Sequence, residues 1–448
     1  MPPLEDGERA ARPSDSIWTM SPAFVTGVQT GGRLRRLYHA FPRQFWLLVA
    51  GFMFLMTGID MCFPFETTYL TTRLGASIST VGLMIGIPAM AVLPLYALDG
   101  AIADRYGRKP AMIAGICVLV ALYSTFGLSR SLWPIAVMIA IEAPFGWALF
   151  LTGSNAMVAD LVSGPRRAEA YSLTRVALDV GITLGPLIAG LVIAADPTFH
   201  SLFLGGATIC AAFVLILALL FRETRPAVAA HHEVALAKTL RGYGVVLRDR
   251  RFLAFCGVSL LPLYCFGQIW VVFPIALRQQ HGVSAQQWGY LLAFYAIAGA
   301  VAQYPVIRWL RGRDHVRALA VASACIGIGL GGAVMAPAGV ATYGFMLAIS
   351  FGVVLLIPLT ATVAAELAPV ALRGRYMGAW TLVQMGGYGL GPTFGGLALG
   401  RLGPSKAAVV TACAGLAGGV LFAATARRFA SGVTPGAGAG EPEGAPAP

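Results

Sequence analysis

The chain has 448 residues, of which 57% are hydrophobic and only 12% charged, and its formal net charge is +12. A soluble domain has roughly a quarter charged residues, so this composition excludes an ordinary water-soluble protein. The basic residues stand between long apolar runs, so we attribute the positive charge to membrane topology and expect no nucleic-acid partner.

Long apolar segments follow one another through most of the chain. A bilayer core about 30 Å thick requires about 20 apolar residues per helix, and this criterion predicts twelve transmembrane helices. The segments are too long for membrane strands and lack their alternation. The expected spans are 45–72, 78–103, 110–128, 132–159, 168–194, 201–221, 252–278, 285–307, 317–336, 342–367, 375–400 and 405–426.

The longest weakly apolar interior stretch divides these helices into two groups of six. We therefore expect an all-α integral membrane protein with two six-helix, pseudo-symmetric bundles at 45–221 and 252–426, joined by a cytoplasmic linker at 222–251. Residues 1–44 are expected to form a flexible cytoplasmic arm, without a cleavable signal peptide. The Gly-, Pro- and Ala-rich residues 427–448 are expected to be a disordered tail.

The basic residues orient the spans. With both termini in the cytoplasm, 26 of the 32 Lys and Arg lie on the cytoplasmic side, and Arg175 lies inside a span. This asymmetry is what the positive-inside rule describes, so we expect a multi-pass protein of the cell membrane with both termini cytoplasmic. The outer loops hold the remaining five: Arg73, Arg130, Arg278, Arg401 and Lys406.

The first span contains two acidic residues, Asp60 near its middle and Glu66 six residues later. Ionisable groups inside a membrane are costly and indicate function by default. Asp60 is therefore a candidate proton-coupling residue, because burial disfavours a charged carboxylate and lets protonation compete with substrate binding. Glu66 lies roughly 9 Å further along the helix axis and has the alternative of being a hydrated residue of the outer mouth.

The turn between the second and third spans is crowded with charge. The stretch "LDGAIADRYGRKP" (98–110) contains five charged side chains between two apolar runs. A basic loop that merely fixes topology needs only Lys and Arg, so that alternative does not explain the acid and the glycines. The candidate functional residues of the turn are Gly100, Asp104, Arg105, Gly107, Arg108 and Lys109.

Three further ionisable groups lie in the fourth and fifth spans. Glu142 lies in the fourth, and Arg175 and Asp179 lie in the fifth. Arg175 and Asp179 are four residues apart, so they share a helix face and could simply pair with each other. The alternative is that they belong to the transport cavity.

The two halves of the sequence are related by an offset of 206 residues. "GITLGPLIAG" (181–190) aligns with "GYGLGPTFGG" (387–396), and Asp160 and Arg167 align with Glu366 and Arg373. Proline kinks a helix and glycine permits close helix packing, so we expect helices 5 and 11 to be bent, although generic packing would need no function. The repeated positions are Gly181, Gly185, Pro186 and Gly190, and Gly387, Gly391, Pro392 and Gly396.

These motifs resemble those of the major facilitator superfamily, in particular its twelve-helix drug–proton antiporter family. "GAIADRYGRK" resembles the superfamily's loop between helices 2 and 3, and "GITLGPLIAG" its antiporter motif in helix 5. The resemblance implies that Asp104 faces the start of helix 11, near Arg373, and that the arginines of the turn meet carboxylates such as Asp160. Such contacts would stabilise the outward-open state. One departure concerns Glu142, which stands where the antiporters carry a helix 4 arginine, and this weakens the case for proton coupling.

The second half offers amides and aromatic rings where the first half has charges. Gln268, Trp270 and Gln384 are the expected contributors to an apolar cavity with few polar groups, which is typical of sites for small organic molecules. For each ring, lipid contact or core packing is the alternative. The scattered cysteines and histidines indicate no metal site, no ATP-binding loop is present, and we expect no cofactor.

The sequence thus predicts a secondary active transporter, not an enzyme, that exports small amphiphilic compounds in exchange for protons by alternating access. Uptake or facilitated diffusion of a polar metabolite, sugar or organic acid is the alternative within transport, and a non-transporting receptor or scaffold is the alternative outside it. The expected partners are a small-molecule substrate, protons and the lipid bilayer, and we expect a monomer.

Overall fold

The computed structural model describes residues 38–91, 96–162, 164–224, 244–310, 313–369 and 372–430. Within these ranges the regular structure is entirely helical. Most of the expected arm (1–44), linker (222–251) and tail (427–448) lies outside the described residues.

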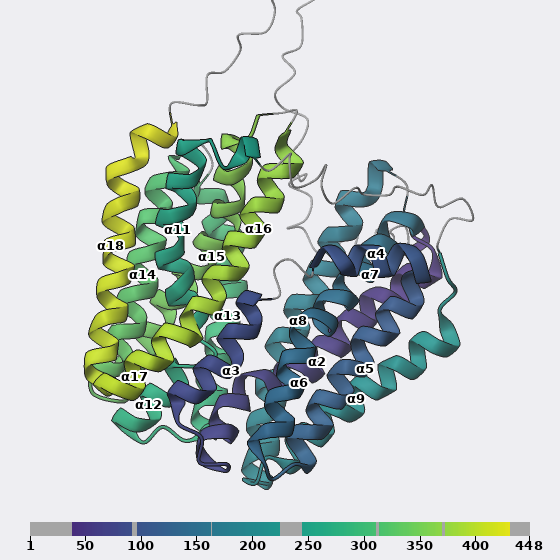
Figure 1. The fold of residues 1–448 in the computed structure, drawn as a ribbon, viewed down its shortest axis with the longest axis horizontal. Helices are drawn as coiled ribbons and strands as arrows, with labels where there is room; N and C mark the ends of the chain where they lie inside the picture. The colour runs from purple at the N-terminus through teal and green to yellow at the C-terminus, as the bar shows by residue number, and fades with distance from the viewer. Residues whose placement is uncertain are drawn as a thin grey trace, which may run out of the picture.

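The helices form two bundles that stand side by side in Figure 1. The first bundle contains α2 (Arg43–Thr72), α3 (Ile78–Ala91), α4 (Tyr96–Tyr106), α5 (Arg108–Leu128), α6 (Leu132–Phe145), α7 (Trp147–Leu161), α8 (Arg167–Ala195) and α9 (His200–Leu220). The second contains α11 (Arg250–Gln268), α12 (Phe273–His281), α13 (Ala285–Leu310), α14 (His315–Met335), α15 (Val340–Leu367), α16 (Arg373–Leu390), the π-helix η4 (Gly391–Gly395), α17 (Gly396–Leu402) and α18 (Pro404–Ala430).

Ten helical segments of the described chain, with α6 and α7 taken together, are long and apolar enough to cross a bilayer. The two expected spans not among them, 78–103 and 375–400, are each divided in the structure. The first consists of α3 and α4, and the second of α16, η4 and α17. The all-α membrane fold is confirmed, and the count of twelve stays a prediction.

Local sequence explains several helix boundaries. Asp249 and Asp314 cap α11 and α14, each carboxylate accepting hydrogen bonds from two backbone N–H groups of the first turn. The expected fourth span is broken between α6 and α7, where Pro144 lies in the last turn of α6 and Gly146 leaves the helical conformation. Pro392 has no backbone donor and lies at the start of η4.

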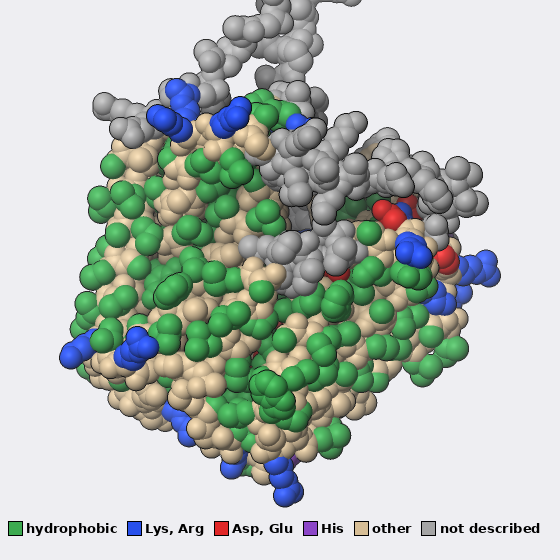
Figure 2. All heavy atoms as spheres, viewed as in Figure 1, with side chains coloured by type: hydrophobic (Ala, Val, Ile, Leu, Met, Phe, Trp, Pro, Cys, Tyr) green, Lys and Arg blue, Asp and Glu red, His purple; other side chains and the backbone are tan. Residues whose placement is uncertain are grey.

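The side chains on the visible face are distributed as a membrane protein requires. Figure 2 shows hydrophobic side chains over the middle of this face, and Lys and Arg gathered toward its two ends. We call the end that carries the α4–α5 turn the motif end, and the other the opposite end.

The two bundles pack together at the opposite end, in the lower part of Figure 1, where α3 contacts α16, η4 and α17. Glycines allow this approach: a Cβ on Gly396 would lie 3.0 Å from the carbonyl oxygen of Ile78. Both hydrogen bonds found between the bundles among the described residues lie here. Ser79 Oγ donates to the Gly396 carbonyl, and Trp288 Nε1 donates to the Pro64 carbonyl, each at 3.3 Å.

Candidate functional site

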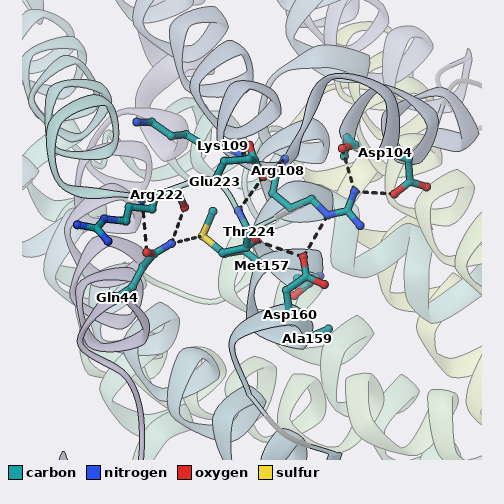
Figure 3. A network of polar contacts seen from close by, with 12 residues as sticks. Gln44, Asp104, Arg108, Lys109, Met157, Ala159, Asp160, Arg222, Glu223 and Thr224 are labelled. Atoms are coloured by element: carbon teal, nitrogen blue, oxygen red, sulfur yellow. Dashed lines mark hydrogen bonds and ion pairs between the residues drawn. The ribbon is translucent and has the colours of Figure 1, made fainter. Parts of the chain in front are cut away.

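The charged turn is organised around Arg108 (Figure 3). The Arg108 Nη1 atom lies 2.6 Å from Asp104 Oδ1, and its Nε atom lies 3.3 Å from Asp160 Oδ2. Nη1 also donates to the carbonyl oxygen of Ala103, at 2.9 Å. One guanidinium therefore joins the last turn of α4 to the last turn of α7, both within the first bundle.

Glu223 completes this network from the segment that follows α9, in the centre of Figure 3. Its carboxylate accepts the backbone N–H groups of Arg108 at 2.9 Å and Lys109 at 3.0 Å, at the amino terminus of α5 where negative charge is favoured. Gly107 has a φ of 109°, and a Cβ there would lie 2.5 Å from Glu223 Oε2, so the turn requires glycine. Glu223 was not among the residues predicted from the sequence, although its position as an acid directly after the sixth span could have indicated it.

Lys109 and Arg105 have different roles from Arg108. The Lys109 ammonium donates to the carbonyl oxygens of Ala218 at 2.8 Å and Phe221 at 2.9 Å, which end α9. Arg105 lies over the ring of Tyr106, 5.4 Å from its centroid. A Cβ on Gly100 would have no neighbour within 4 Å, so no close packing accounts for glycine at this position.

The structure does not bring Asp104 to helix 11. The Asp104 side chain is 72% exposed and pairs with Arg108, and within the described residues no contact joins it to α16. Arg373, the first residue of α16, is also exposed. The contact across the bundles implied by the family resemblance is therefore absent from this conformation, in which the bundles pack together at the opposite end.

The second bundle has its own version of the Asp160 ion pair, in a region where the sequence motif is degraded. Glu366 aligns with Asp160 in the repeat, and Glu366 Oε1 lies 3.0 Å from His315 Nδ1 at the start of α14. Arg167 forms no such pair and donates to the carbonyl oxygens of Val162 and Ala159.

The repeated glycines occupy matching places in the two bundles. In α8, a Cβ on Gly185 would lie 2.6 Å from the backbone of Asp60 in α2, and one on Gly181 would lie 2.5 Å from the Met53 carbonyl oxygen. In the second bundle, a Cβ on Gly391 would lie 2.5 Å from Gly267 in α11. The last glycine of each motif faces the other bundle. Gly190 lies near Tyr290, and Gly396 lies near Gly82. Gly387, the first glycine of the second motif, packs on Leu263 of α11 within its own bundle.

Pro186 and Pro392 differ although they align. Pro186 lies inside α8, which continues without interruption from Arg167 to Ala195, whereas Pro392 lies in the π-helix that separates α16 from α17. Short π segments occur often at functional sites.

The deep acids of the first bundle have distinct environments. Asp60 is half-buried, whereas Glu66 is only 5% exposed. Glu142 Oε1 accepts the Trp147 N–H at 3.4 Å and so caps α7 at the break in helix 4. Glu142 also acts electrostatically on Glu66. Two acids from α2 and α6 thus interact inside the first bundle, which the sequence did not reveal.

Groups from both bundles meet along the interface. Arg175 Nη2 lies 2.9 Å from Asp179 Oδ1, so the two residues pair as their spacing allows. Arg175 also acts electrostatically on Tyr388 of α16, whose hydroxyl accepts a hydrogen bond from Gln384 Nε2 at 3.0 Å.

A chain of aromatic rings continues this interface. The rings of Phe63 in α2 and Trp270 after α11 lie 6.3 Å apart, and those of Trp270 and Tyr295 lie 6.0 Å apart. Gln268, in contrast, is buried within the second bundle, where its Oε1 accepts from Thr411 at 3.0 Å. Phe63 of the first bundle therefore meets aromatic rings of the second, whereas Gln268 lies inside the second bundle.

Comparisons with known proteins place this geometry in a family. The family model described as Major Facilitator Superfamily matches residues 48–392 and 259–445. Multidrug resistance protein MdtH of Edwardsiella ictaluri (strain 93-146) is 28% identical over 360 residues, covering 79% of this chain and 85% of that protein. The MFS-type transporter YqjV of Bacillus subtilis (strain 168) is 24% identical over 364 residues, covering 81% and 87%.

Solved structures share the fold at low sequence identity. Peptide transporter POT in complex with sulfate has a TM-score of 0.71 and 14% identity, covering 89% of this chain and 99% of that chain. A bacterial homologue of the human lysosomal transporter Spinster, in an inward-facing and unoccupied conformation, has a TM-score of 0.69 and 14% identity, covering 88% and 98%.

Proposed function

Because the chain belongs to the major facilitator superfamily of transporters, we propose that it exports small amphiphilic organic compounds in exchange for protons, by alternating access between the two bundles. One observation carries the proposal, namely the asymmetric interface. Acids of α2 and α8 lie on one side of it, and the aromatic and amide groups of α11, α13 and α16 lie on the other. The name of the relative MdtH supports the substrate class.

We assign the motif end to the cytoplasm, because the positive-inside rule places the basic turns there. In this conformation the bundles are joined at the opposite end, by Trp288–Pro64 and Ser79–Gly396 among other contacts. With the motif end cytoplasmic, a conformation joined at the opposite end is the inward-facing state.

Asp60 is the proposed coupling acid. It is half-buried on α2, and its backbone packs against Gly185 of the antiporter-like motif in α8. Phe63, three residues on, shares its helix face and contacts Trp270 across the interface. A protonated acid suits a dry cavity, whereas the anion suits a cavity that holds water or an organic cation. Proton and substrate then exclude each other at one place.

Inside-out membrane vesicles test the proposal. A fluorescent aromatic cation should accumulate in vesicles that contain the protein only while their interior is acidic, and a protonophore should abolish the accumulation. Asp60→Asn should lose this uphill transport and retain downhill exchange, whereas Glu169→Gln, at an exposed acid in the first turn of α8, should behave as the wild type. Accumulation that never exceeds equilibrium and ignores the gradient would establish facilitated diffusion instead.

A further inference from the structure

Asp99 is a buried acid that neither the network around Arg108 nor the interface explains. It lies in the first turn of α4, five residues before Asp104, and the residue is 0% exposed. Neither carboxyl oxygen has a hydrogen-bond partner. Buried polar groups are nearly always paired, so a fully buried acid without a partner requires a physical account.

The face of α4 that carries Asp99 packs on other helices of the first bundle. Ala103, four residues later on the same face, forms an apolar cluster with Ala111 of α5 and Leu149 of α7. The helix also contacts α6. The cluster one turn along from Asp99 is therefore apolar and contains no hydrogen-bond donor side chain.

The charged and titratable groups of these helices are directed elsewhere. Arg108 is bound to Asp104 and Asp160, and the Lys109 ammonium to the end of α9. On the same three helices, the Tyr123 hydroxyl donates to the Ile59 carbonyl, Glu142 caps α7 and Cys117 is exposed; on α4, Arg105 lies over Tyr106.

The cost of burying a charge decides whether Asp99 is ionised or protonated. An ion buried without a partner costs several kcal/mol, whereas the amino terminus of a helix recovers at most about 2 kcal/mol for a negative charge. Among the residues that the structure describes, no cation or donor supplies the rest. The neutral acid avoids most of this cost, because a proton removes the charge where no counter-ion is available.

We propose that Asp99 is a second proton-holding site, separate from the acids at the bundle interface, and that it carries a proton in this conformation. Helix 2 connects the site to the transport cycle, because its α3 part packs on the second bundle while its α4 part packs on the first. Movement of one bundle relative to the other therefore acts on α4, and entry of water beside Asp99 would release the proton. This role in the cycle rests on the proposed function, whereas the protonation itself does not.

Infrared difference spectroscopy on the purified full-length protein tests the protonation without any transport. The wild type minus Asp99→Asn spectrum should contain the carbonyl stretch of a protonated carboxylic acid at mildly acidic pH. The wild type minus Glu169→Gln spectrum should lack it, because Glu169 is exposed. If the Asp99→Asn difference shows the paired bands of an ionised carboxylate instead, the proposal is overturned.

A stability measurement covers the case in which Asp99→Asn does not fold. Asp99→Leu keeps four side-chain heavy atoms in the same branched arrangement and removes the unpaired polar group, so a neutral acid without partners predicts an unchanged or higher Tm. A strong fall in Tm, or no folded protein from either variant, would contradict the proposal. The acid band could be absent in Asp99→Asn while wild-type vesicles show no proton coupling. That result would support Asp99 as a proton-holding site and contradict the proposed proton-coupled export.

Discussion

Gly82 of α3 is the position at which a single methyl group should change the conformational balance. A Cβ there would overlap the carbonyl oxygen of Pro392, and it would lie 3.1 Å from that carbonyl carbon and 3.3 Å from the Cα of Gly396. All three atoms are backbone atoms of the other bundle, which cannot rotate away as a flexible side chain would. Gly82→Ala must therefore push α3 away from η4 and α17.

The size of the effect follows from this overlap. An added methyl group in a close-packed contact costs about 1–3 kcal/mol. The contact exists only while the bundles are joined at the opposite end, so we expect this cost to fall on one state of the cycle. A difference of that size shifts the ratio of the two states about 5- to 150-fold, toward the state that is open at the opposite end.

Distances between spin labels would measure this shift. Leu128→Cys and Val340→Cys place labels on the two bundles at the opposite end, where these side chains are 71% and 89% exposed. The exposed Cys117 and Cys413 should be replaced by serine in this background. Gly82→Ala should increase the population with the longer label separation, whereas Gly257→Ala, which has no neighbour within 4 Å of its Cβ, should not.

An unchanged distance distribution in Gly82→Ala, from protein that is folded and binds lipid normally, would refute the argument. It would mean that α3 and η4 can separate locally without moving the bundles. An equal shift in Gly257→Ala would mean that the labels report general destabilisation of the helices.

The remaining predictions concern the charged turn at the motif end, the contact between the bundles at the opposite end, and the topology. Asp104→Asn should leave insertion and Tm nearly unchanged, because an exposed pair such as Asp104–Arg108 contributes only about 0–1 kcal/mol. Transport in a vesicle assay should nevertheless fall strongly. Near-normal flux at normal expression would indicate that the turn only fixes the membrane topology. Trp288→Phe removes the donor to the Pro64 carbonyl. It should shift the ratio of the two states reported by the same labels about 2- to 10-fold, since a hydrogen bond contributes about 0.5–1.5 kcal/mol. No shift would mean that this hydrogen bond does not help to hold the bundles together at the opposite end. A reporter fused at Ala430 should be active only in the cytoplasm, and external activity would contradict an even number of spans.

The sequence alone allowed the class of fold to be predicted, because hydropathy over about 20 residues reports a requirement of the bilayer and not of any particular contact. It also allowed the Arg175–Asp179 pair to be predicted, since a spacing of four fixes neighbours on a helix. The break in helix 4 was not predicted, and helix 11, which was expected to be bent, is divided by a π-helix. Proline and glycine also occur inside helices that continue, as Pro186 does in α8.

Tertiary structure alone decided which polar groups meet. Glu223 reaches the amino terminus of α5 from a segment more than a hundred residues away in the chain. Asp104 and Asp99 belong to one charged turn in the sequence, yet the first is 72% exposed and the second is fully buried. The sequence determines what each residue can ionise or donate. Packing determines whether water, a counter-ion or only apolar atoms surround it, and that depends on how distant helices lie against one another.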